Sequence, residues 1–149
     1  SGGFPVILVD ANLILYAEDS LSAHHEAARE WWDARLSGSD LVCLCWPVLT
    51  AFLRISTNAR IIGRPLTRQE ACTRVSRWLD QPCVRVVGAT SGHWGILRGL
   101  IKEAEATANL IPDAHLAALA IEHGCTLYSN DRDFGRFPSL KWINPLQGG

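Results

Sequence analysis

The segment Ile111–Phe134, with the sequence IPDAHLAALAIEHGCTLYSNDRDF, constrains the fold of this chain more than any other part. Its first half has apolar residues at spacings of three and four, which predicts a helix packed along one face. Gly124 is placed to end that helix, and the short apolar run Cys125–Tyr128 predicts a buried strand. Asp131 follows this strand, where open α/β sheets place their ligand sites. The segment therefore predicts a helix, a central strand and an acidic loop in succession.

The first strand of the chain ends in the same way. Val6–Val9 is an unbroken apolar run, which is typical of a strand covered on both faces, and Asp10 follows it directly. If the two strands are parallel neighbours, Asp10 and Asp131 meet at one edge of the sheet, and Asp113 opens a helix beside them. Carboxylates that close repel one another and resist ionisation. A divalent ion removes this conflict, and oxygen ligands favour Mg²⁺ or Mn²⁺ over softer metals.

The rest of the chain repeats strand and helix patterns. These patterns predict a three-layer α/β/α fold with a parallel sheet between helical layers. Right-handed crossovers then bring the strand ends that precede helices to one side of the sheet. The remaining predicted strands are 41–45, 83–87 (buried) and 140–143 (at an edge), and the remaining predicted helices are 23–36 after an N-cap at Ser22, 46–56, 67–80 and 90–106, the last with Trp94 on its packed face.

Charge and cysteine content limit the classes of function. The net charge is −1 and the pI about 6.5, so any surface that binds RNA must be a local basic one. Twelve of the fourteen basic residues are arginine, which suits bidentate contacts to phosphate or carboxylate, although codon usage explains this count equally well. Five cysteines, an odd number with no zinc-site spacing, predict reduced thiols in a cytoplasmic protein. No apolar run is long enough to span a membrane, and a single domain is expected over residues 4–146 after an expression-tag remnant at Ser1–Gly3.

Three stretches, VDANLILYA, FLRISTNAR and PDAHLAALAIEHGCTLYSNDRDF, resemble PIN-domain ribonucleases, and most closely the VapC toxins of bacterial toxin–antitoxin pairs. The resemblance extends from about Val6 to Pro145. It implies a PIN-like fold with a central sheet of about five strands and a metal-dependent endoribonuclease with Mg²⁺ or Mn²⁺ as cofactor. It also implies an RNA substrate, a small VapB-like antitoxin as partner and a homodimer, with no membrane partner.

The residues and the resemblance together predict the site. Asp10, Asp113 and Asp131 are expected to hold the metal and to be catalytic, with Asn12, Ser129 and Asn130 orienting ligands or water. No His or Cys is placed as a nucleophile, so a water activated by the metal is the expected attacking group. Two further residues are assigned supporting roles: Asp133, which ranks lowest among the acids, and Arg54, which is expected either to approach a phosphate or carboxylate or to form a plain surface ion pair.

Each acid also has a structural explanation. Asp113 suits a helix start because the helix dipole favours a carboxylate there, and Asp131 suits a turn that its own side chain closes. Asp10 is the hardest of the three to explain structurally. A phosphorylated Asp10 is disfavoured because that chemistry usually has a second Asp two residues on, where this chain has Asn12.

The chain departs from the PIN pattern at one position. Many relatives carry a Glu just before the FLR-like stretch, and this chain has Ala51 there. Glu103 or Glu105 is a possible substitute, and a solvated helix end is the alternative for both. The missing Glu also motivates a second function, a catalytically weakened PIN-like domain that binds RNA or protein. An antitoxin helix is expected to lie in the groove at the strand ends, with Trp46, Trp94 and Phe52 as aromatic contacts.

Overall fold

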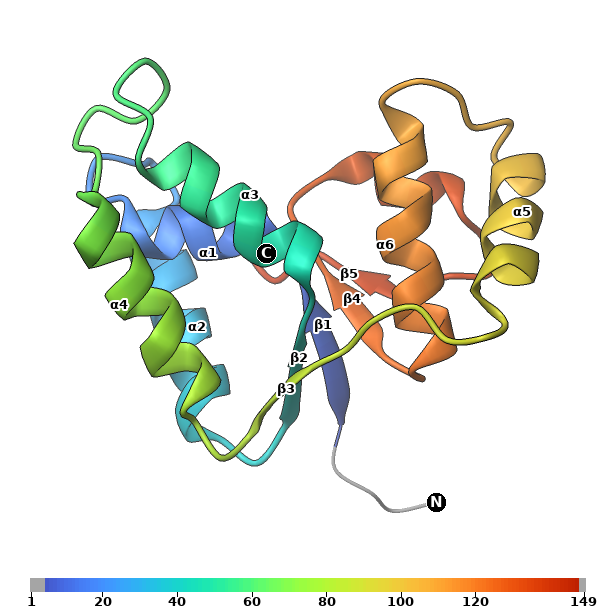
Figure 1. Cartoon of the computed structure of the whole chain (residues 1–149), viewed down its shortest axis with the longest axis horizontal. Coiled ribbons are helices and arrows are strands. Elements are labelled where there is room, and N and C mark those ends of the chain that lie inside the picture. The colour runs from blue at the N-terminus through green and yellow to red at the C-terminus, as the bar shows by residue number, and fades with distance from the viewer. Residues whose placement is uncertain (1–4, 148–149) are drawn as a thin grey trace.

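A central parallel sheet organises the computed structural model, which describes residues 5–147 and contains five strands in that range (Figure 1). The strands lie in the order β3-β2-β1-β4-β5, and every neighbouring pair is parallel. The strands are β1 Val6–Val9, β2 Leu41–Leu44, β3 Val84–Val86, β4 Thr126–Tyr128 and β5 Trp142–Ile143. The predicted parallel sheet of about five strands is confirmed, whereas the tag remnant expected at Ser1–Gly3 lies outside the described residues.

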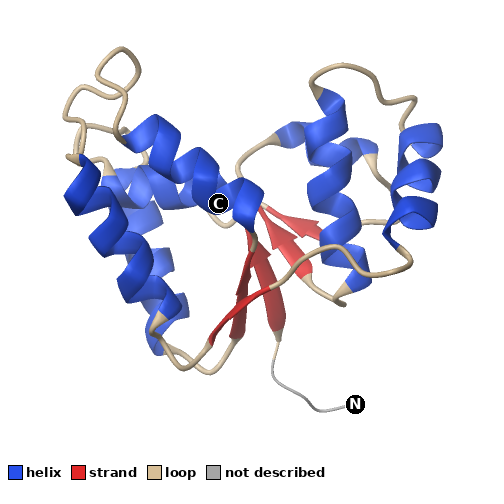
Figure 2. Ribbon diagram, viewed as in Figure 1, coloured by secondary structure: helices blue, strands red, loops and turns tan. Residues whose placement is uncertain are grey.

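Helices cover the sheet on both sides (Figure 2). Helices α1 to α4 lie on one side of the strands and α5 and α6 on the other, which gives the predicted three layers. The helices are α1 Ala11–Glu18, α2 His25–Ser37, α3 Trp46–Ser56, α4 Arg68–Leu79, α5 His93–Glu103 and α6 Leu110–Glu122, with a 3₁₀ turn η1 at Arg132–Arg136. None of these helices is long and apolar enough to span a membrane.

Strand β1 lies at the centre of the sheet, and Ile7, Leu8 and Val9 in it are buried. Ile7 and Leu8 pair with β2 on one side and with β4 on the other. Because all three strands run in the same direction, the carboxyl ends of β1 and β4 lie side by side. The N–H of Asp10 donates a hydrogen bond to the carbonyl of Tyr128 at 3.0 Å. The apolar run that predicted a strand buried on both faces therefore also places Asp10 beside the end of β4.

Helix α6 begins and ends at residues that the sequence marks. It starts at Leu110, so Pro112 lies in the first turn, where the backbone N–H groups have no helical partner and a proline loses none. Gly124 has φ +65°, and its N–H donates to the carbonyl of Ile121 while the N–H of Cys125 donates to Ala120. This pair of bonds is the Schellman arrangement. It turns the chain directly into β4, as predicted.

Strand order and helix rotation, which local patterns do not encode, account for two wrong predictions. The third strand was predicted to be buried, but only Val84 is buried in β3 because that strand forms the outer edge of the sheet. Trp94 was predicted to pack, but it is 64% exposed because α5 packs through Ile96, Leu97 and Leu100.

Two further predictions are corrected around α2 and α3. Helix α2 begins at His25, and the Ser22 hydroxyl accepts the N–H of His24 in the turn before it, so Ser22 is not the helix cap. Phe52 is fully buried, with its ring 4.7 Å from that of Trp78, and is not available to line a groove.

Candidate metal centre

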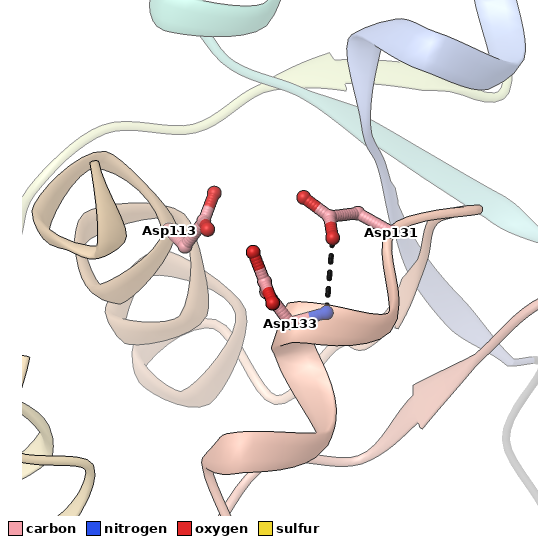
Figure 3. Close-up of side chains that lie close together, drawn as sticks. All are labelled: Asp113, Asp131 and Asp133. Carbon is pink, nitrogen blue, oxygen red and sulfur yellow. Dashed lines mark hydrogen bonds between the residues drawn. The ribbon is translucent and has the colours of Figure 1, made fainter.

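Three aspartates from two separate segments face a common space (Figure 3). Asp113 comes from the first turn of α6, whereas Asp131 and Asp133 come from the loop after β4 and from η1. One carboxylate oxygen from each lies within 4.8 Å of those of the other two. None of the ion pairs found in residues 5–147 involves these aspartates. Three acids thus meet without a cationic side chain to balance them.

Asp133 belongs to this closest group although the sequence ranked it last. Asp131 caps η1, and its Oδ1 accepts the N–H of Asp133 at 2.9 Å. This turn brings the second carboxylate back beside the first, and Figure 3 shows both with Asp113. Asp131 therefore has both roles that the sequence allowed: it closes the turn, and it belongs to the acidic group. The spacing of two residues between the acids was the available signal.

Asp10 lies beside this group but outside the closest three. Its Oδ1 accepts the N–H of Ala11 at 2.8 Å and caps α1, and its Oδ2 accepts the Ser129 hydroxyl at 2.6 Å. Burial, opposed by these two hydrogen bonds and assisted by the charge of Asp131, raises the pKa of Asp10. Asp10 therefore caps a helix, a structural role that the sequence did not suggest. It also lies close enough to Asp131 to feel the charge of the acidic group.

Ser129 connects the two strand ends. Its buried hydroxyl donates its one proton to Asp10 and accepts from the Asn12 amide at 3.2 Å and from the N–H of Asp131 at 3.0 Å. A hydroxyl has one proton and two lone pairs, so its hydrogen-bonding capacity is filled. Ser129 and Asn12 thus hold Asp10 and the acidic loop in a fixed relation.

Asn130 extends this network to residues that the sequence did not indicate. Its N–H donates to Asn12 at 3.3 Å, its amide donates to the Tyr16 hydroxyl at 3.3 Å, and its side-chain oxygen accepts from Asn144 at 2.9 Å. Tyr16 belongs to α1, and Asn144 follows β5. These contacts join segments far apart in the chain. Tyr16 belongs to the stretch VDANLILYA, but nothing in that stretch indicates a contact with Asn130.

Ala51 lies in the wall of the site. A cavity of about 140 Å³ is lined by Asp10 and Asp113 on one side and by Ala51 on α3 on another. The remaining lining residues are Ala11, Pro47, Val48, Pro112 and Leu116. The position where many relatives have Glu therefore faces the acids here with a methyl group, and the cavity wall on that side is apolar.

The two proposed substitutes do not supply the missing acid. Glu103 accepts both the N–H and the hydroxyl of Ser139, at 3.2 and 2.8 Å. Glu105 is exposed beyond the end of α5. Arg54 is exposed and forms no ion pair with any of residues 5–147. It lies one helical turn beyond Ala51, on the face of α3 that leads from the cavity.

The acidic group makes metal-free stability depend on pH. Burial, followed by the charges of Asp131, Asp10 and Asp133, raises the pKa of Asp113 from 3.8 to about 6. Between these values the folded chain holds a proton that the unfolded chain has released. The contribution of Asp113 to the free energy of unfolding is therefore complete below the lower pKa and is lost as pH rises through the upper one.

Urea unfolding in EDTA is expected to show a free energy of unfolding that falls between about pH 4 and pH 6. The Asp113→Asn variant is expected to lack this contribution, and identical pH profiles for the two proteins would contradict it.

Comparisons with known proteins show which proteins this chain is similar to in sequence and in fold. The family model described as PIN domain matches residues 7–140. Ribonuclease VapC37 of Mycobacterium tuberculosis is 44% identical over 138 residues, which cover 93% of this chain and 96% of that protein. Ribonuclease VapC33 of the same species is 38% identical over 142 residues, covering 95% and 99%. A solved toxin–antitoxin complex from Klebsiella pneumoniae has the same fold, with a TM-score of 0.63 at 15% identity, covering 93% of this chain and 97% of that one.

Proposed function

The chain belongs to the PIN-domain family, and we propose that it is a metal-dependent endoribonuclease and the toxin of a toxin–antitoxin pair. Relatives that cover nearly the whole chain are named as VapC ribonucleases. The observation that carries the proposal is the group of Asp113, Asp131 and Asp133, whose carboxylates converge and form no ion pair with any of residues 5–147. Such a group is costly unless a bound ion balances it.

The donor set fits a hard divalent cation. PIN-domain ribonucleases are in general dependent on a divalent metal, and a set of carboxylate oxygens alone favours Mg²⁺ or Mn²⁺ over Zn²⁺ or Cu²⁺. We assign Asp113, Asp131 and Asp133 as residues that hold the ion. Asp10 is assigned with them, because a carboxylate that accepts two hydrogen bonds retains further lone pairs. An ion held by these residues would lower the pKa of a water and offset charge on the scissile phosphate.

The other residues of the site fix this donor set in place. The Ser129 hydroxyl donates to Asp10 and so favours its ionised form. Asn12 holds both Ser129 and the backbone of Asn130, which keeps the acidic loop against α1. The wall that includes Val48 and Leu116 is apolar on the side facing Asp10 and Asp113. Charges act more strongly beside such a wall than in bulk water.

A second candidate function rests on Ala51. The apolar wall in place of an acid supports a domain that binds RNA or protein but cuts weakly. The acids that remain lie close together, and hydrogen bonds fix the carboxylates of Asp10 and Asp131, which favours the nuclease. The two functions differ in one observable, the cleavage of RNA that depends on added metal.

A cleavage assay tests this function. The purified chain is expected to cut a structured RNA in Mn²⁺ or Mg²⁺ and to leave it intact in EDTA. Attack by water on the phosphodiester is expected to leave a 5′-phosphate and a 3′-hydroxyl, which end-labelling identifies. RNA that is bound but uncut in either metal would contradict the nuclease and support the binding module. Cleavage that continues in EDTA would contradict the metal site.

A further inference from the structure

The charges of this chain are distributed unevenly along its length. Residues 54–79 contain six arginines and a single acidic residue, Glu70, which gives this segment a net charge of +5. Because the whole chain carries −1, the remaining residues together carry −6. The six arginines, called here the arginine segment, are Arg54, Arg60, Arg64, Arg68, Arg74 and Arg77.

The arginine segment occupies one arm of the molecule. It runs from the end of α3 through the loop before α4 and then along α4 (Figure 1). Five of the six side chains belong to exposed residues, and only Arg74 forms an ion pair within residues 5–147, with Glu18 at 2.6 Å. The positive charge of this arm is therefore left largely without partners on the chain itself.

Two clefts lie along α4. One cleft of about 620 Å³ is lined by Arg64 and Arg74 together with two acids, Glu18 and Glu70. The other, of about 530 Å³, is lined by Arg74, Arg77 and Arg29 of α2 with Glu18 as its one acid, so it carries the excess of positive charge. Arg74 and Glu18 line both, so the two clefts adjoin. A groove with arginines spaced along it is suited to a chain of phosphates rather than to a single small anion.

We propose that the arginine segment binds the phosphate backbone of the RNA substrate and holds the RNA while it is cut at the acidic site. This inference rests on the proposed nuclease function. The acidic site itself repels RNA, so the affinity must come from a separate basic surface. Guanidinium groups form bidentate contacts with phosphate, and the segment contains no lysine. Arg54 lies one helical turn beyond Ala51, which lines the cavity with Asp10 and Asp113. The arginine segment therefore begins near the acids that would cut RNA, and this favours RNA over an acidic protein as its ligand.

Binding without cleavage tests this inference. The probe is a fluorescein-labelled single-stranded RNA of about 20 nucleotides, longer than common single-strand binding sites, titrated in EDTA at several salt concentrations. The test variant is Arg64→Gln/Arg68→Gln/Arg77→Gln, and its control is Arg98→Gln/Lys102→Gln/Arg136→Gln. All six side chains belong to exposed residues outside the ion pairs of the described chain, and both triple variants change the net charge equally. Thermal unfolding checks both folds, and the single variant Arg68→Gln replaces the triple if the triple does not fold.

The salt dependence distinguishes contacts from net charge. Loss of three phosphate contacts is expected to make the slope of log affinity against log salt shallower by about 2. For each tenfold dilution of salt, the affinity of the variant is therefore expected to rise about 100-fold less than that of the wild type. The single variant is expected to lower it by about 0.7. The control is expected to keep the wild-type slope. The inference would be overturned if the triple variant kept the wild-type slope, or if the control lost as much slope as the triple variant. It would also be overturned if the triple variant bound RNA normally and lost only the binding of a co-purified antitoxin. A chain that binds RNA but does not cut it in metal contradicts the nuclease function instead.

Discussion

Replacement of Asp131 by Asn is expected to lower the rate of RNA cleavage by at least about 10³-fold. A divalent ion offsets several kcal/mol of charge in the transition state, and about 4 kcal/mol corresponds to about 10³ in rate. An amide removes one of the three close carboxylates without changing the shape of the side chain. Asp10→Asn is expected to have a comparable effect, because Asp10 shares the field of the same group.

The fold is expected to survive both substitutions. Asn caps helices and closes such turns as well as Asp does, so the bonds to Ala11 and to Asp133 are retained, whereas Asp10→Asn loses one of the two oxygens that accept from Ala11 and Ser129. Without metal the Asp131→Asn variant is expected to unfold at the same temperature as the wild type or higher, because one of several mutually repelling charges is gone. Glu30→Gln, an exposed acid on α2 outside every ion pair of residues 5–147, is the matched control and is expected to keep full activity. Near wild-type cleavage by Asp131→Asn would disprove the site assignment.

Expression of the chain alone is expected to arrest growth of its host, and co-expression of the small antitoxin encoded beside it is expected to restore growth. The acidic group gives a physical means for this control. Carboxylates without a cation attract an Arg or Lys supplied by a partner, which then competes with both the metal and the RNA. Of the aromatic residues predicted to contact that partner, Trp46 and Trp94 are exposed and remain available, whereas Phe52 is buried.

Growth curves with an inducible promoter measure this prediction. The Asp131→Asn variant is the control and is expected to be harmless when expressed alone, although it is expected still to bind the antitoxin through the rest of the surface. A wild-type chain that is harmless alone and that captures no small partner from its own cells would contradict the toxin role. The nuclease function is tested separately by cleavage of purified RNA.

Much of the fold and the core of the site could be predicted because their signals are local. The apolar run of β1, the helix pattern of α6 and the break at Gly124 each lie within a few residues. Together they place Asp10 and Asp131 after parallel strands, and parallel strands share one edge. The sequence therefore indicates that Asp10 and Asp131 share an edge of the sheet, but not that Asp133, rather than Asp10, completes the closest group of three.

Long-range contacts account for what could not be predicted. Asn130 meets Tyr16 across 114 positions of the chain, and such a pair leaves no trace in a local pattern. The exposure of β3 depends on its place at the edge, which follows from the order of all the strands. Asp10 was judged the least structural of the acids, yet it caps α1, because a residue that ends a strand also begins the next helix.

Crystals of the chain soaked in Mn²⁺ test the central claim most directly. An anomalous difference map is expected to show a manganese peak within bonding distance of Asp113 and Asp131, with Asp133 and Asp10 beside it. Crystals of Asp131→Asn treated in the same way are expected to lose the peak or to show it much weakened. A peak that persists in the variant, that appears only elsewhere on the molecule, or that is missing from the wild type would contradict a metal centre built from these aspartates.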